Sequence, residues 1–162
     1  MTGERARAAR VVVASNRAAA GVYPDRAGPV IVAWLAERGF QVPEPVVVGD
    51  GDPVAAAVRD AVADGVDVLI TTGGTGISPT DRTPEATRPV LDLELPGLAE
   101  AIRSAGLPAV PTAVLSRGLA GVAGRTVVVN LPGSVGGVRD GLGVLAGVLD
   151  HAVQQLHGGD HT

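Results

Sequence analysis

The chain is 162 residues long, carries a net charge of −4 and is 46% hydrophobic, values that predict one globular domain and argue against general nucleic-acid binding. It contains no cysteine and no lysine, so all thirteen basic residues are arginine. Disulfide bonds, thiolate metal sites, lysine Schiff bases and the P-loop lysine are therefore excluded.

The elements expected in the first half of the chain alternate between strand and helix. They are a strand over RVVVAS (10–15), a helix over 29–38, a strand over PVVV (45–48), a helix over 52–65 and a strand over VDVLITT (66–72). The strands are short β-branched runs, and the helices repeat their apolar residues at helical spacing. Asp52 is the expected N-cap of the second helix, with Pro53 at its first helical position.

The second half continues the alternation. We expect a helix opening at Thr83-Pro84-Glu85, a helix over 95–106, a strand over PTAVLS (111–116), a strand over RTVVVN (125–130) and one long helix from Ser134 to about His157. Gly141, Gly143 and Gly147 inside the last helix each cost about 1 kcal/mol relative to alanine. Close backbone packing is the expected reason for them.

Strands rich in valine that alternate with helices indicate an α/β protein with a mostly parallel sheet, covered on both faces. We expect a single domain over 1–162, with 1–9 and 158–162 as flexible tails. In such sheets, ligands bind beyond the carboxyl ends of the strands. Three loops follow strand ends and are expected to converge: SNRAAAGVYPDRAG (15–28), TTGGTGISPTD (71–81) and NLPGS (130–134).

The sequence also bears on the cellular location of the protein and on whether histidine can form its active site. MTGERARAAR lacks the apolar core of a signal peptide, and no apolar run is long enough to span a membrane, so we expect a cytoplasmic protein without a membrane segment. All three histidines lie in the last twelve residues, which argues against a histidine-centred active site. His151 and His157 are six residues apart and do not stack on one helical face, so both are expected at the surface.

The glycine loop is suited to anions, although it matches neither G-x-G-x-x-G nor the Walker A motif. Glycine lets backbone amides approach a phosphate closely, and the neighbouring hydroxyls can donate to phosphate oxygens. The candidate ligand-binding residues of this loop are Thr72, Gly73, Gly74, Thr75, Gly76 and Ser78. The alternative is a glycine-rich turn without a ligand.

Asp81 is an acid in this otherwise anion-binding loop. A carboxylate repels a phosphate unless a cation lies between them, and Mg²⁺ commonly takes one or two carboxylates together with substrate phosphates. The alternative is a structural role for Asp81, as a helix N-cap or in a salt bridge with Arg82 or Arg88.

The two other loops supply further candidates. In the first loop they are Ser15, Arg17 and Gly21, and in the last they are Asn130, Pro132, Gly133 and Ser134. Backbone amides at the start of the final helix can bind anions. The alternative for the first loop is that these residues are solvated and bind no ligand. The alternative for the last loop is an ordinary turn between a strand and a helix, with Ser134 as the helix cap. Arg117 either contacts the ligand or braces the loops.

These motifs resemble the MogA/MoaB family of molybdenum-cofactor biosynthesis proteins. The resemblance is carried by SNRAAAGVYPDRAGP, TTGGTGISPTDRTPEAT, PTAVLSRG and VVVNLPGS, which follow the family order over about residues 10–156. It implies a three-layer α/β/α fold that binds molybdopterin, a pterin dithiolene with a terminal phosphate. It also implies a homotrimer, with a hexamer as the alternative, and a molybdenum-insertion partner of the MoeA type.

The activity implied by the MogA branch is adenylylation: molybdopterin and MgATP give adenylyl-molybdopterin and pyrophosphate. The substrate phosphate attacks the α-phosphorus of ATP, and two aspartates act with Mg²⁺. One of these falls on Asp81. The other follows the second strand in VVVGDGDP, where Asp50 is the most natural register and Asp52 the fallback. The resemblance thus implies that Asp50 and Asp81 are catalytic and hold the metal.

Three departures from the family pattern keep other functions open. Asn16 replaces a frequent aspartate, Val135-Gly136 replaces a common Pro-Lys, and Gly49 replaces a frequent proline. The loss of the lysine charge favours a non-catalytic MoaB-type protein that binds or carries molybdopterin. A CinA-type nucleotide pyrophosphatase would use the same glycine loop, but Arg82 stands where a second acid is expected.

Overall fold

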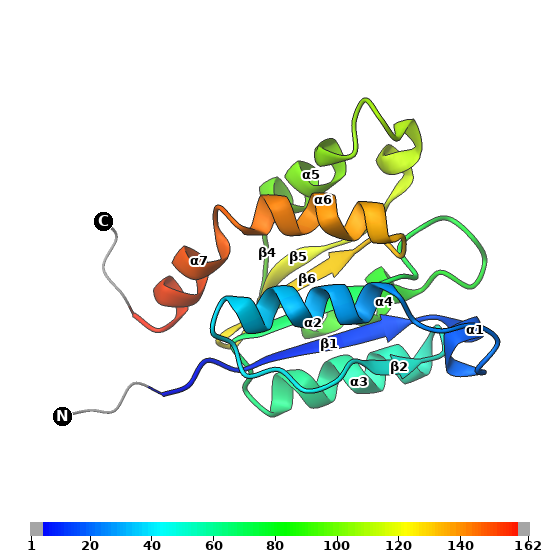
Figure 1. Cartoon of the computed structure of the whole chain (residues 1–162). Helices are drawn as coiled ribbons and strands as arrows, with labels where there is room; N and C mark the ends of the chain where they lie inside the picture. Colours follow the sequence, from blue (N-terminus) through cyan, green and yellow to red (C-terminus); the bar gives the residue numbers. More distant parts are fainter. Residues whose placement is uncertain (1–4, 159–162) are drawn as a thin grey trace.

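The computed structural model describes residues 5–158 and arranges them as a six-stranded sheet between two layers of helices (Figure 1). In chain order the elements are β1 (Ala9–Ala14), α1 (Asn16–Ala19), α2 (Ala27–Glu37), β2 (Val46–Val48), α3 (Asp52–Ala63), β3 (Val68–Thr72), α4 (Thr83–Thr87), η1 (Arg88–Val90), β4 (Leu93–Glu94), α5 (Pro96–Ala105), η2 (Pro111–Leu115), β5 (Ala120–Ala123), β6 (Thr126–Leu131), α6 (Val135–Leu145) and α7 (Leu149–Leu156).

The sheet confirms the expected α/β class and adds an antiparallel edge. Its strand order is β2-β1-β3-β6-β5-β4. The first four strands are parallel neighbours, whereas β5 and β4 pair antiparallel. The sequence did not predict these two strands, because β5 is the alanine- and glycine-rich segment AGVA and β4 has only two residues. Neither carries the β-branched run that identified the others.

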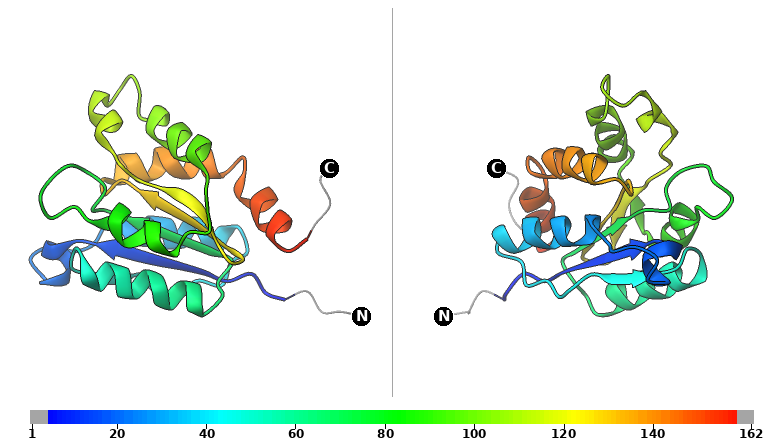
Figure 2. Two further views of the ribbon diagram at one scale, coloured as in Figure 1. Left: turned by 180° about the vertical axis from the view of Figure 1, so that it is seen from behind. Right: turned by 45° about the vertical axis from the view of Figure 1, so that its right-hand side comes forward.

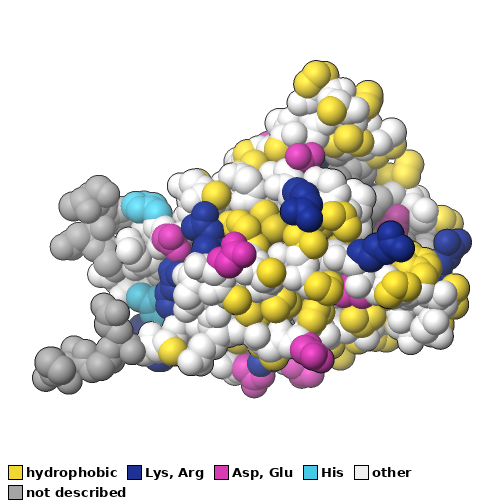
Figure 3. All heavy atoms as spheres, in the orientation of Figure 1, with side chains coloured by type: hydrophobic (Ala, Val, Ile, Leu, Met, Phe, Trp, Pro, Cys, Tyr) yellow, Lys and Arg dark blue, Asp and Glu magenta, His cyan; other side chains and the backbone are white. Residues whose placement is uncertain are grey.

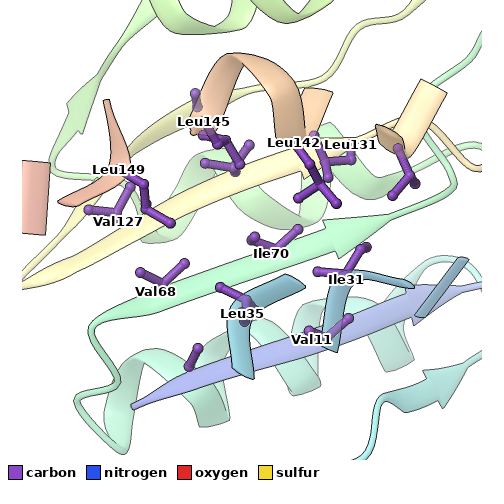
Figure 4. Close-up of a cluster of buried hydrophobic side chains, with 14 of the residues drawn as sticks. Val11, Ile31, Leu35, Val68, Ile70, Val127, Leu131, Leu142, Leu145 and Leu149 are labelled. Carbon is purple, nitrogen blue, oxygen red and sulfur yellow. The ribbon is translucent and has the colours of Figure 1, made fainter. Parts of the chain in front are cut away.

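Each face of the sheet has its own hydrophobic core. Val11 and Val13 of β1 point into the core beneath α2, α5 and α6. Figure 4 draws side chains of this core, among them Val11 of β1, Ile31 of α2 and Leu145 of α6. The alternate residues Val12 and Ala14 point into a second core against α3. Figure 2 shows α3 and α4 on this opposite face. Strands buried on both faces explain why valine is nearly continuous along them.

The C-terminal segment forms two helices where one long helix was expected. α6 ends at Leu145 and α7 begins at Leu149. The amide of Gly147 donates to Val144 O and that of Val148 to Leu145 O, so tight turns replace helical bonds between the two helices. The apolar stripe crosses the break, since Leu145 and Leu149 both reach the same core. Hydrophobic spacing alone therefore could not reveal the break.

The predicted strand over 111–116 is wrong. The segment is the 3₁₀ helix η2, which opens on Pro111 and packs beside α5. The amide of Ala113 donates to Val110 O and that of Ser116 to Ala113 O, so the backbone bonds locally instead of joining the sheet. The start of α3 also differs, because Gly51 is its N-cap and Asp52 is already helical.

The N-terminal segment is held more closely than expected. Residues 5–9 were assigned to a flexible tail, but β1 begins inside this segment, and the amide of Ala8 donates to Asp67 Oδ2 at 2.7 Å. Arg5 pairs with Asp67 Oδ1 at 2.8 Å, and His157 Nε2 lies 2.7 Å from the same oxygen. His157 is thus tied to a buried carboxylate. Residues 1–4 and 159–162 of the expected tails lie outside the described residues.

Gly141 and Gly143 give a stability prediction. A Cβ on Gly141 would come within 2.6 Å of Leu131 Cδ2, whereas a Cβ on Gly143 would meet nothing within 4 Å. Close packing therefore explains Gly141 but not Gly143. We expect Gly143→Ala to raise the free energy of unfolding by about 1 kcal/mol and Gly141→Ala to lower it by about 1–3 kcal/mol, measured by urea denaturation. Equal effects of the two changes would contradict the packing argument.

The outer surface of the helical layer carries apolar side chains. Hydrophobic side chains gather over α2 and α6 in the space-filling view (Figure 3), where Val30, Trp34 and Leu142 line a groove. The Arg38 guanidinium lies 4.4 Å from the centre of the Trp34 ring. Within residues 5–158, no helix combines the length and apolar character that a membrane span requires.

Candidate active site at the carboxyl ends of the strands

The three loops that follow β1, β3 and β6 converge, as predicted, around a cavity of about 640 Å³. It lies where the parallel strands end, at the right-hand end of the sheet in Figure 1. Each loop contributes residues to the lining of this cavity, for example Arg17, Gly73 and Gly133. Asp50, which follows β2, also lines it. Convergence follows from parallel pairing, which brings the carboxyl ends of neighbouring strands to one edge.

The glycine loop owes its path to two residues with positive φ. Gly73 has φ +89° and Gly74 has φ +68°, a region that side chains disfavour. A Cβ on Gly73 would lie 2.3 Å from the carbonyl oxygen of Ala14, and one on Gly74 would lie 2.3 Å from Thr83 Oγ1. Only glycine therefore fits at either position. The amide of Gly73 donates to Leu131 O at 3.1 Å, which ties the loop to β6.

A second cavity of about 730 Å³ lies on the other side of this loop. Gly73, Gly74, Gly133 and Asp81 line both cavities. Gly133 packs directly on Gly73, since a Cβ on Gly133 would come within 3.3 Å of the Gly73 Cα. We call Gly73, Gly74 and Gly133 the glycine wall. The second cavity continues beneath α5 and η2, which contribute the apolar side chains of Ile102, Val110 and Leu115.

Asp81 is held by its own turn and faces both cavities. Its Oδ2 accepts from the amide of Ser78 at 2.9 Å, and its own amide donates to Ser78 O at 3.0 Å. The structural alternatives are not borne out in residues 5–158. There, Asp81 forms no salt bridge with Arg82 or Arg88, and the N-cap of α4 is Arg82.

Asp50 lines the first cavity together with Asp81. Its amide donates to Asn16 Oδ1 at 2.9 Å, whereas its Oδ1 is buried and has no hydrogen-bond partner among the described residues. Burial, and secondarily the charge of Asp81, raise the pKa of Asp50. Asp52, the fallback for the second functional aspartate, is exposed on α3 and lines neither cavity.

The other predicted ligand-binding residues fall into three groups. Ser15, Arg17 and Thr72 line the first cavity, and the second is lined by Thr75, Gly76, Ser78, Pro132 and Ser134. Ser15 Oγ caps α1 and Ser134 Oγ caps α6, each by accepting an amide hydrogen at 3.1 Å. Gly21 and Asn130 line neither cavity.

Asn130 is a buried residue, and its side-chain hydrogen bonds are made within the protein. Its side chain lines neither cavity, and the residue is 3% exposed. Nδ2 donates to Thr71 Oγ1 at 2.8 Å and to Thr87 Oγ1 at 3.1 Å, and Oδ1 accepts from the amide of Leu119 at 3.0 Å. It thereby joins β3, β6 and α4. A strand-end asparagine cannot be assigned from sequence to a ligand or to the interior.

Arg117 braces the glycine loop. Its Nε donates to Gly76 O at 2.8 Å and one terminal nitrogen to Asp81 O at 3.1 Å. The guanidinium also pairs with both carboxylate oxygens of Glu85, and these hydrogen bonds lower the pKa of Glu85. The backbone amide of Arg117 adds a bond to Thr75 O at 2.7 Å. Arg117 thus makes the bracing contacts that were one of its two expected roles.

Several residues of the site had no sequence signal. Asp25 and Arg26 reach the first cavity from the loop after α1, and the α5–η2 segment reaches the second. Their positions follow from tertiary contacts rather than from a local motif. In residues 5–158 no group of three or more His, Cys, Asp or Glu side chains could hold a metal by itself. A divalent cation would need substrate atoms as additional ligands.

Comparison with known proteins gives matches over most of the chain. Residues 10–151 match a family model described as a probable molybdopterin binding domain. A solved structure described as MogA is 67% identical with a TM-score of 0.91, covering 93% of this chain and 99% of its own. The Mog protein from Mycobacterium ulcerans is 59% identical with a TM-score of 0.91, covering 96% and 99%.

Curated relatives differ in length. The molybdopterin adenylyltransferase of Haemophilus influenzae is 38% identical over 86% of this chain and 72% of its own length. A molybdenum cofactor biosynthesis bifunctional protein from Synechococcus elongatus is 37% identical over 94% of this chain. The chain spans only about half the length of that bifunctional protein. By its matched residues and these relatives, the chain belongs to the family of probable molybdopterin binding domains.

Proposed function

We propose that this chain is a molybdopterin adenylyltransferase of molybdenum cofactor biosynthesis. The reaction transfers the adenylyl group of ATP to the terminal phosphate of molybdopterin. A phosphate oxygen of molybdopterin forms a bond to the α-phosphorus, the bond from that phosphorus to the bridging oxygen breaks, and pyrophosphate leaves with the bond electrons. Relatives that carry this name span most of the chain, which supports the proposal.

The observation that carries the proposal is the glycine wall shared by the two cavities. Substrates bound on opposite sides of Gly73, Gly74 and Gly133 can meet at this wall, where no side chain blocks the approach of phosphate groups. Asp81 faces both sides. Phosphoryl and nucleotidyl transfer depend mainly on positioning and on neutralising charge, and a wall without side chains suits the close positioning of two substrates.

Mg²⁺ enters this site as part of the MgATP substrate. Asp50 and Asp81 line the same cavity and offer two carboxylates, the number that magnesium commonly takes beside substrate phosphates. The Asp50 carboxylate makes no hydrogen bond through its buried Oδ1 among residues 5–158, so this bond does not hold it away from a ligand. The cation would neutralise charge on the phosphates as the transfer proceeds. Cysteine, lysine and histidine are not required for this chemistry.

The charges suggest which substrate occupies which cavity. The first cavity has both aspartates and the guanidinium groups of Arg17 and Arg26, which suit MgATP. The second has apolar walls from Ile102 and Leu115, which suit a flat pterin ring. Both assignments leave the reacting phosphates at the glycine wall.

The proposal is tested by incubating the protein with molybdopterin and MgATP. We expect pyrophosphate and adenylylated pterin in equal amounts, with no product when Mg²⁺ is chelated. Folded protein that binds molybdopterin but yields neither product would overturn the proposal and leave the MoaB-type binding protein as the function. That alternative draws support from Gly136, which lines the second cavity at the position where the family resemblance implies a lysine.

Arg17→Ala is expected to raise the KM for ATP about tenfold, with the KM for molybdopterin and kcat within about twofold of the parent. Arg17 is exposed at the first cavity and forms no ion pair in residues 5–158, so its guanidinium is available for a nucleotide phosphate. Steady-state kinetics with each substrate varied in turn measure the effect. Arg139→Ala, which removes an exposed arginine outside both cavities, is the control. Equal rises in both KM values would contradict the cavity assignment.

We further propose a cytoplasmic homotrimer that passes its product to a molybdenum-insertion protein of the MoeA type. The family motifs of the sequence support this proposal. Light scattering during size-exclusion chromatography is expected to give three times the chain mass of 16.2 kDa. Six times that mass would indicate the hexamer, and the mass of one chain would contradict either assembly.

A further inference from the structure

Two buried side-chain oxygens without a hydrogen-bond partner lie side by side in the described structure. They are Oδ1 of Asp50, after β2, and Oγ1 of Thr83, the first residue of α4. Native proteins pair nearly all such atoms, because an unpaired buried polar group lowers stability. A site that is completed by its ligand is a physical reason for retaining two of them together.

Gly74 brings the two oxygens to the same space. A methyl group placed on Gly74 would come within 2.3 Å of Thr83 Oγ1 and within 3.0 Å of Asp50 Oδ1. Both atoms therefore face the Cα of one glycine. Any other residue type at position 74 would push the threonine and the aspartate apart.

Thr83 itself does not reach a ligand. The residue is 0% exposed and lines neither cavity. Asp50, in contrast, lines the first cavity. The Thr83 hydroxyl can therefore act on a ligand only indirectly, and Asp50 is the cavity residue whose side-chain oxygen shares its space beside Gly74.

The backbones on both sides are fixed. The amide of Thr83 donates to Gly74 O at 3.0 Å, and Thr83 O accepts from Thr87 Oγ1 at 2.7 Å. The amide of Asp50 donates to Asn16 Oδ1 at 2.9 Å. Both oxygens approach the same point above the Gly74 Cα, at 2.3 Å for Thr83 Oγ1 and 3.0 Å for Asp50 Oδ1, so a pairing between them needs movement of the side chains rather than of these fixed backbones.

We propose that Thr83 is a positioning residue for Asp50. When MgATP is bound, the Thr83 hydroxyl donates a hydrogen bond to Asp50 Oδ1, directly or through one buried water. This bond turns the other carboxylate oxygen toward the cation that accompanies ATP. The inference rests on the proposed function, because it takes MgATP as the ligand of the first cavity.

The test replaces Thr83 with valine, which keeps the β-branched shape and removes the hydroxyl. We expect Thr83→Val to raise the Mg²⁺ concentration for half-maximal binding of a non-hydrolysable ATP analogue about tenfold, measured by calorimetry. The melting temperature should be unchanged or higher, because the lost hydroxyl has no partner in residues 5–158. The KM for molybdopterin should not change.

Thr83→Ser is the matched control, since it keeps the hydroxyl and removes a buried methyl group. It should melt at a lower temperature than the parent and keep the Mg²⁺ dependence within about twofold. Opposite effects of valine and serine on stability and on Mg²⁺ dependence would support the positioning role. An unchanged Mg²⁺ dependence in Thr83→Val, or an equal shift in both variants, would overturn it.

The parent protein separates this inference from the proposed function. If it binds the ATP analogue with Mg²⁺ and adenylylates molybdopterin, only the comparison of the two Thr83 variants decides the role of the hydroxyl. If the parent shows neither Mg²⁺-dependent nucleotide binding nor turnover, the adenylyltransferase proposal fails first, and the Thr83 inference falls with it.

Discussion

Asp81→Asn should lower the rate of molybdopterin adenylylation by at least about 10²-fold while leaving the fold and molybdopterin binding intact. Asparagine has the same shape, and its amide oxygen can still accept from the amide of Ser78, as Asp81 Oδ2 does at 2.9 Å. The substitution removes the negative charge that faces both cavities. Single-turnover measurements of pyrophosphate release, with circular dichroism and pterin-binding titrations beside them, separate lost chemistry from lost structure.

Asp52→Asn is the matched control for this prediction. Asp52 is an exposed aspartate two residues after Asp50, and it lines neither cavity. We expect the turnover of this variant to stay within about twofold of the parent, since surface substitutions rarely change more than local solvation. A large loss in Asp52→Asn, or near-normal turnover in Asp81→Asn, would contradict the assignment of the two functional aspartates to Asp50 and Asp81.

Gly73→Ala should disable the site through the backbone. A Cβ at this position would lie 2.3 Å from the carbonyl oxygen of Ala14, and φ at Gly73 is +89°. The clash is with the backbone of β1, so no side-chain rotation relieves it. We expect the free energy of unfolding to fall by about 3 kcal/mol or more and turnover to fall at least about 10²-fold, since the glycine wall must shift.

Gly21→Ala separates the cost of positive φ from the cost of the clash. Gly21 has φ +74°, but a Cβ there would meet nothing within 4 Å, and the residue lines neither cavity. We expect this variant to lose about 1 kcal/mol of stability and to keep its turnover. Urea denaturation and the adenylylation assay measure both quantities. If the two alanine variants behaved alike, the contact between Gly73 and Ala14 would not be what fixes the loop.

The sequence predicted those helices and strands whose residue types and spacing strongly favour one secondary structure. The valine-rich runs of β1, β3 and β6 are strands because β-branched side chains suit a sheet buried on both faces. The predictions that were wrong concern segments whose composition favours no single secondary structure or whose hydrophobic spacing fits more than one arrangement. PTAVLS has strand-like composition but became η2, and the break between α6 and α7 leaves the apolar stripe intact. Hydrophobic periodicity indicates which face of a helix is buried, but it does not indicate whether the helix continues without a break.

The residues of the candidate site likewise include some that the sequence could identify and others that it could not. Gly73, Gly74 and Asp81 could be proposed from one continuous motif, because glycine freedom and a carboxylate beside hydroxyls have direct chemical meaning. Arg117 and Thr83 could not. Arg117 lies 36 residues from Asp81, to whose carbonyl it donates, and the Thr83 oxygen becomes notable only because Asp50 and Gly74 surround it in space.

The sequence by itself determined the α/β class and the glycine loop, excluded cysteine and lysine chemistry and argued against a histidine-centred site, because each follows from residue type and position along the chain. Only the tertiary structure decided that the loops enclose two cavities with a common wall, that Asn130 is interior and that Arg117 is a brace. Those outcomes depend on which strands pair and in what register. Contacts between residues dozens of positions apart leave no local pattern from which they could be predicted.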